Sequence, residues 1–250
     1  MRASSSISLR SEAGFTIVEL LVGMIIGTVV LIASLTVLDG AIGVTSKVNA
    51  RVDAAQRGRN AMDQIVRDLR SSVCVGRLTN ATTGATTTDD SILAGSATSV
   101  DFYTDLGDGT KKADGTDNSP PTRRTLVFDP TAKTIVEKIY VPTGKRGAYT
   151  FPATPTTTRT LATDVIQQDT STPVFQFFAY DTQTPPTPSV LLPVPLTTAN
   201  EQRTVKITIT FRAVRTAGDS NTAVAATFQD DVFRRLVDPN DSDPAPECQA

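Results

Sequence analysis

The sequence predicts an α+β protein in which one long helix is followed by an antiparallel β head. Three patterns support this fold class: an apolar run from Phe15 to Leu38, a helical repeat of apolar residues after it, and a strict alternation of apolar and polar residues from Arg203 to Ala213. Because the helical patterns come first and the strand patterns follow, helix and strands are segregated along the chain, as in α+β folds.

The apolar run is long enough to cross a membrane. It spans 24 residues, and at about 1.5 Å of rise per residue a helix of this length covers a hydrocarbon core about 30 Å thick. Glu19 is its only charged residue. A carboxylate at mid-bilayer costs about 2.5 to 3.5 kcal/mol on insertion scales, so Glu19 is expected to have a partner and a function.

The residues before the run form a leader, residues 1–14, that contains Arg2 and Arg10 and ends in Ala13-Gly14. A secretory signal is cut after its apolar region, whereas here the small residues come before it. Cleavage after Gly14 would leave the helix on the mature chain and give Phe15 a new α-amino group. In a staggered bundle of identical helices, that amine could meet Glu19 of the next subunit.

Residues 14–22, Gly-Phe-Thr-Ile-Val-Glu-Leu-Leu-Val, resemble the cleavage and methylation signature of type IV prepilins and of the pseudopilins of type II secretion. The resemblance implies a pilin-like fold and a structural subunit. It also implies that a prepilin peptidase cleaves between Gly14 and Phe15 and N-methylates Phe15, and that Glu19 governs docking into a growing filament.

A second resemblance lies further along the helix. Gln56-Arg57-Gly58-Arg59 and Arg67-Asp68-Leu69-Arg70 are similar to stretches of the W-type minor pilins and J-type minor pseudopilins, and with the leader this likeness covers residues 1 to about 75. It implies a minor subunit that acts in initiation or at the filament tip. The implied partners are other pilin or pseudopilin subunits, the prepilin peptidase, the membrane and the inner-membrane assembly platform.

The same resemblance implies a location. The chain would span the cytoplasmic membrane once, with the leader in the cytoplasm and the head outside, and would then enter a cell-surface or periplasmic filament. Adhesion, motility, DNA uptake and protein secretion all remain open as the task of that filament. The alternative function is a membrane-anchored extracytoplasmic adhesin or enzyme that uses the helix only as a signal anchor.

The helix is predicted in two parts, a membrane or filament-core part over 15–38 and an amphipathic part over 39–75. Gly23 and Gly27 have the spacing that allows close helix packing in membranes. In the second part, apolar residues recur at spacings of three, four and seven, which predicts a stripe buried against the head. That stripe comprises Val44, Val48, Val52, Ala55, Met62, Ile65, Val66, Leu69 and Val73.

The remaining residues, 76–250, are predicted to form a β-rich head with a mobile C-terminal tail. Turn residues around Pro130 predict a hairpin over 125–141. The prolines of residues 181–200 predict a segment without regular structure. Strands are expected near 99–103, 125–129, 133–141, 174–180, 203–213 and 223–233.

Charge and composition exclude several classes of function. The chain has no histidine, which removes Ser-His-Asp and Cys-His nucleophile systems, and no Gly-rich phosphate loop is present. We therefore expect no catalytic residues, no metal centre and no cofactor. Residues 71–250 carry 16 basic against 20 acidic side chains, which argues against nucleic acid as the main ligand. The loop from Asp105 to Asn118 offers oxygen ligands for calcium, but its spacing does not match an EF-hand, and a solvated loop is the favoured interpretation.

The two cysteines lie at the ends of the head. Cys74 follows the predicted helix, and Cys248 is two residues from the C-terminus. In an exported domain an even number of cysteines is compatible with one disulfide, which would tether the acidic tail. Two free thiols are the alternative.

Overall fold

The computed structural model consists of one long helix, a short helix and fourteen strands within the residues that it describes, which are 14–73, 75–79, 86–89, 91–105, 120–145, 148–183, 186–214 and 226–234. The helices are α1, Ile17–Arg70, and α2, Thr198–Arg203. The strands are β1 (Val75–Thr79), β2 (Thr86–Asp89), β3 (Ile92–Gly95), β4 (Ser99–Thr104), β5 (Thr122–Asp129), β6 (Thr134–Tyr140), β7 (Thr143–Lys145), β8 (Ala148–Thr150), β9 (Thr157–Thr163), β10 (Val165–Ile166), β11 (Phe175–Ala179), β12 (Val190–Leu191), β13 (Lys206–Ala213) and β14 (Ala226–Phe233).

The chain divides into two compact units, Met1–Asn49 and Ala50–Ala250. The first contains the N-terminal part of α1, whose large apolar side chains are exposed in the isolated chain. The hydroxyl groups of Thr28, Ser34, Thr36 and Thr45 donate to backbone carbonyl groups of the same helix. Ser34 Oγ, for example, donates to the Val30 carbonyl oxygen at 2.8 Å. The donor of this hydroxyl group is therefore satisfied even in an apolar environment.

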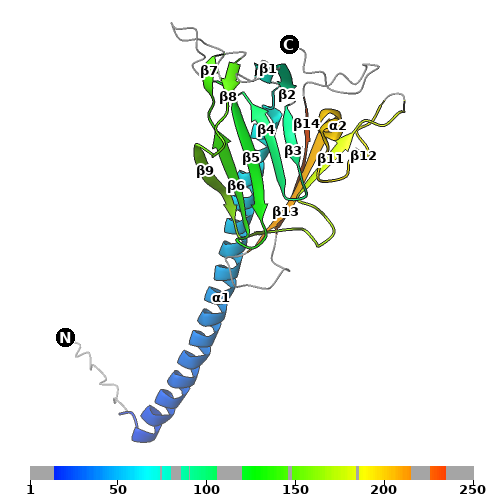
Figure 1. Ribbon diagram of the computed structural model, residues 1–250. Coiled ribbons are helices and arrows are strands. Elements are labelled where there is room, and N and C mark those ends of the chain that lie inside the picture. The colour runs from blue at the N-terminus through cyan, green and yellow to red at the C-terminus, as the bar shows by residue number, and fades with distance from the viewer. Residues whose placement is uncertain are drawn as a thin grey trace, which may run out of the picture. The chain divides into compact units, whose positions relative to one another are not determined.

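The second unit is built from two five-stranded sheets and two short hairpins, and every pairing among the described strands is antiparallel. The first sheet has the order β3-β4-β5-β6-β9 and appears in shades of green in Figure 1. The predicted hairpin is confirmed as β5 and β6. Asp129 Oδ1 closes its turn by accepting from the backbone N–H groups of Thr131 at 2.8 Å and Ala132 at 2.9 Å, while Lys133 adopts a positive φ of 53°.

The second sheet is organised around β13, which is orange in Figure 1, with β11 and β12 in yellow and β14 in red-orange. Strand β14 pairs with β13 along its full length, from Lys206↔Phe233 to Ala213↔Ala226. Strands β10 and β11 pair with different segments of β13 and therefore share its other edge, and β12 pairs with β11. The alternation over Arg203 to Ala213 therefore correctly predicts a strand.

One apolar core joins both sheets to the last turns of α1. From the first sheet it receives side chains such as Phe102 and Leu126, and from the second Phe177 and Phe211, all of them fully buried. The helix contributes four large apolar residues of the predicted stripe. These are Met62, Ile65, Val66 and Leu69.

The predicted stripe begins too early. Val44, Val48 and Val52 are exposed, because burial starts only at Ala54. The helical repeat continues past the first residue that contacts the head, so periodicity alone could not locate that residue.

One expectation for the head is also corrected. The proline-rich segment 181–200 is not free of regular structure, since it contains β12 and the start of α2 at Thr198.

Candidate functional site

The predicted cleavage bond lies just outside α1. Gly14 and Phe15 precede the helix and are exposed, and the first helical residue is Ile17. Thr16 caps the helix: its side-chain Oγ1 accepts a hydrogen bond from the Glu19 backbone N–H at 3.3 Å, and its carbonyl oxygen accepts from Glu19 N at 3.1 Å and Leu20 N at 3.2 Å. The bond between Gly14 and Phe15 is therefore not held within helical hydrogen bonds.

Glu19 lies in the first turn of α1 and is exposed. Its neighbours along the helix are apolar, and the region Phe15 to Leu38 contains no other acidic or basic residue. The structure thus places Gly14, Phe15 and Glu19 within the first turn and the segment leading into it. The positive end of the helix dipole lies at the same place, which favours a carboxylate there.

The predicted packing glycines are available for contact. An added Cβ at Gly23 or Gly27 would meet no atom within 4 Å, so neither glycine is required for packing within the chain itself.

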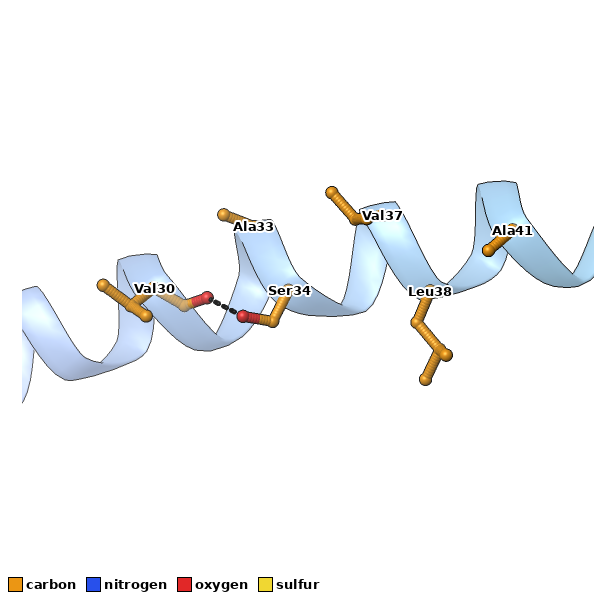
Figure 2. A pocket seen from close by; sticks show the side chains of 6 residues that line it. All are labelled: Val30, Ala33, Ser34, Val37, Leu38 and Ala41. Carbon is orange, nitrogen blue, oxygen red and sulfur yellow. Dashed lines mark hydrogen bonds between the residues drawn. The ribbon is translucent and has the colours of Figure 1, made fainter.

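A second surface on the same helix was missed by the sequence analysis. Figure 2 shows a shallow apolar hollow, where the small residues Ala33, Ser34 and Ala41 leave space beside larger neighbours. The sequence contains the pattern that places these residues together, since Ala33, Val37 and Ala41 are spaced four apart and so lie on one face of the helix. The hollow is lined by Val30, Ala33, Ser34, Val37, Leu38 and Ala41.

The Gln-Arg-Gly-Arg stretch attaches α1 to the second sheet. Gly58 is buried, and a Cβ added there would come closer to the Phe228 ring of β14 than the 3.0 Å that real Cβ atoms keep. Arg57 forms ion pairs with Asp53 and, at 3.7 Å, with Asp164. From the sequence, Gly58 is a weak point of the helix. In the structure, its lack of a side chain allows the helix backbone to approach the Phe228 ring closely.

The Arg-Asp-Leu-Arg stretch contributes Asp68 to a buried group of charges. Asp68 and Glu137 of β6 are both 0% exposed. Arg124 of β5 and Arg159 of β9 each form ion pairs with both carboxylates. We call these four residues the charge cluster. Burial, the largest effect, raises the pKa of Asp68 above its usual value of 3.8, and the charge of Glu137 acts in the same direction, while the Gln64 hydrogen bond and the Arg124 charge oppose them.

Two further sets of predicted site residues lie outside the described part of the chain. They are the cysteines, Cys74 and Cys248, and nearly all of the acidic loop from Asp105 to Asn118. Within the described residues, no group of three or more His, Cys, Asp or Glu side chains could hold a metal ion.

The comparisons bear on the N-terminal segment. Among the described residues, α1 is the one helix long and apolar enough to cross a membrane. No curated protein matches the sequence. Residues 9–35 match the family described as the prokaryotic N-terminal methylation motif, and the matched range includes Gly14, Phe15 and Glu19. The match and the α+β architecture together support a membrane-anchored precursor of the type IV pilin and pseudopilin kind.

Proposed function

We propose that this chain is a structural subunit, a minor pilin or minor pseudopilin, of a type IV pilus or type II secretion filament, where it acts in initiation or at the tip. A prepilin peptidase removes residues 1–14 and methylates Phe15. The helix holds the subunit in the cytoplasmic membrane, with the head outside, until the assembly platform transfers it to a filament made with other pilin subunits.

The methylation motif over 9–35 is the observation that carries this proposal. Its support comes from the local structure, in which Gly14 and Phe15 precede the helix that begins at Ile17. A peptidase must bring a peptide bond into an active site, and a bond outside helical hydrogen bonding is open to it. A signal anchor used only for tethering has no need of these features.

Glu19 supplies the assembly step of the proposal. After cleavage, the α-amino group of Phe15 is positive or nearly so at neutral pH. At about 4 Å, its attraction to Glu19 of an adjacent subunit is on the order of 4 kcal/mol at an effective dielectric near 20, before desolvation is subtracted. Even a fraction of this free energy would favour one register between neighbouring helices.

The minor-subunit part of the proposal rests on the resemblance of residues 56–59 and 67–70 to W-type and J-type subunits. In this chain those stretches position Gly58 against the second sheet and Asp68 against the first. They therefore attach the helix to a head of two sheets, which is a role that any subunit with this head requires. Filament position is best tested separately from processing.

The direct test of the proposal replaces Gly14 with valine. The peptidase must fit the residue before the cut bond, and a β-branched side chain there should block it, so Gly14→Val is expected to accumulate as the longer precursor. The matched control is Gly43→Val, because Gly43 has no neighbour within 4 Å and lies well beyond the bond. Intact-mass measurement of the membrane fraction distinguishes precursor from mature chain.

The parent and the Gly43→Val chain are expected to begin at Phe15 with one added methyl group. If Gly14→Val also begins at Phe15, cleavage does not require the glycine and the prepilin proposal loses its main support. If the parent retains residues 1–14 in cells that have an active prepilin peptidase, the chain is not a processed prepilin.

A further inference from the structure

The charge cluster is unusual because it brings two fully buried carboxyl groups together. Arg124 Nη1 is 2.6 Å from Glu137 Oε1 and 3.2 Å from Asp68 Oδ1. One guanidinium nitrogen therefore serves both acids, so the acids are close neighbours. Like charges that share one buried site oppose each other's ionisation.

The two acids are not equivalent. Glu137 receives the shorter contacts, from Arg124 and from Arg159 Nε. Asp68 has the longer ion pairs, at 3.2 Å to Arg124 and 3.5 Å to Arg159, and the neutral amide of Gln64 donates to both of its oxygens at 2.9 Å. Asp68, which has the longer ion pairs and whose pKa is raised by burial, is therefore the acid to which we assign the proton.

The cluster also joins different elements of the fold. Asp68 belongs to the last turn of α1, whereas Arg124, Glu137 and Arg159 belong to β5, β6 and β9. The state of the Asp68 carboxyl therefore affects how firmly the end of the helix is held against the first sheet.

We propose that the charge cluster is a pH-responsive latch, which holds the last turns of α1 against the first sheet more tightly in mild acid than at neutral pH. When Asp68 carries a proton, it shares that proton with Glu137 as a hydrogen bond, and both guanidinium groups neutralise a single buried anion. When Asp68 loses the proton, a second negative charge is buried beside Glu137. This property goes beyond the proposed role in a filament and does not depend on it.

The direction follows from the pKa of Asp68. Burial, the largest cause, raises this pKa, and the charge of Glu137 acts in the same direction, while Gln64 and Arg124 lower it. An acid whose pKa is higher in the folded state than in the unfolded state contributes stability below the unfolded value. That contribution is lost as the pH rises through the folded value, so the hold on the helix weakens toward neutral pH.

The other charged groups near Asp68 leave this direction unchanged. From the sheet, the side chains that face it are Arg124, Glu137 and Arg159. On α1 itself, Arg67 and Arg70 are exposed and therefore strongly screened. The side chain of Arg159 is 42% exposed, so the charge cluster borders on solvent at this residue.

The test is hydrogen exchange of the full chain in detergent micelles at pH 4.5 and pH 8, with protection factors corrected for intrinsic exchange. In the parent chain, the amides of residues 61–70 are expected to lose about fivefold in protection at the higher pH. Asp68→Asn keeps the shape of the side chain but cannot ionise, so protection of the same amides should be equal at the two pH values.

The matched control is Asp169→Asn. Asp169 is exposed, and its pKa is lowered to about 2, so it does not titrate in this range and the variant should keep the parent's pH difference. The proposal is overturned if Asp68→Asn retains that difference. It is also overturned if protection in the parent chain does not change with pH or rises with pH. This second outcome is measured on the parent alone, so it does not depend on whether a variant folds. Cleavage after Gly14 is not involved, so the outcome is independent of the filament proposal.

Discussion

Gly58→Ala is expected to destabilise the head, although alanine is normally the better helix residue. In an open helix this change would stabilise by about 1 kcal/mol. Here the new Cβ would lie within 3.0 Å of three atoms of the Phe228 ring, and overpacking of this kind costs about 1 to 3 kcal/mol. The second effect exceeds the first over most of that range, so a net loss of up to about 2 kcal/mol is predicted.

The assay is denaturant unfolding of the full chain in detergent, followed by a probe of the head. Gly43→Ala is the matched control, because nothing lies within 4 Å of an added Cβ there and only the gain in helix propensity remains. The pair Gly58→Ala and Phe228→Leu should be less destabilising than the sum of the single changes, because the smaller side chain makes room. A Gly58→Ala chain as stable as Gly43→Ala would refute the close-packing argument.

Three further outcomes are expected. Glu19→Val should insert and be cut after Gly14 but be poorly recovered in sheared filaments, because the attraction to a neighbour's α-amino group is lost; equal recovery of mutant and parent would show that the carboxylate is dispensable. Non-reducing peptide mapping of exported chain should recover Cys74 and Cys248 in one linked peptide pair, and two free thiols would exclude the tether. Asp169→Asn should reduce stability at pH 5, with the deficit shrinking as the pH falls from about 4 toward 2, because hydrogen bonds from Ser171 and Thr172 lower the pKa of Asp169 from 3.8 to about 2; a deficit independent of pH would contradict this origin.

The elements predicted well are those whose signal is local. The strands β4, β5, β6, β11, β13 and β14 match expected segments within a few residues, since alternation and turn residues report directly on a pleated strand. The strands β1, β2, β3, β7, β8, β9, β10 and β12 were not expected. All of these except β9 have five or fewer residues, too few for a clear pattern, and β9, Thr157–Thr163, lacks the alternation of apolar and polar residues.

The candidate site divides in the same way. Gly14, Phe15 and Glu19 could be named because the motif is contiguous. Asp68 and Glu137 could not be brought together from the sequence, because they lie on different elements and each looks like an ordinary surface acid. They come together because α1 packs on the first sheet. The spacing of residues along the sequence does not indicate this tertiary contact.

The junction between α1 and the first sheet is short, and this has a mechanical consequence. The helix ends at Arg70, and within three residues the backbone pairs with β4, through a bridge of Ser72 with Thr104 and a hydrogen bond of 3.0 Å from Val73 N to the Tyr103 carbonyl oxygen. Tension applied along the C-terminal part of the helix would reach the sheet directly, with no slack linker to extend first. Under load, this junction should therefore pass force to the head without first lengthening.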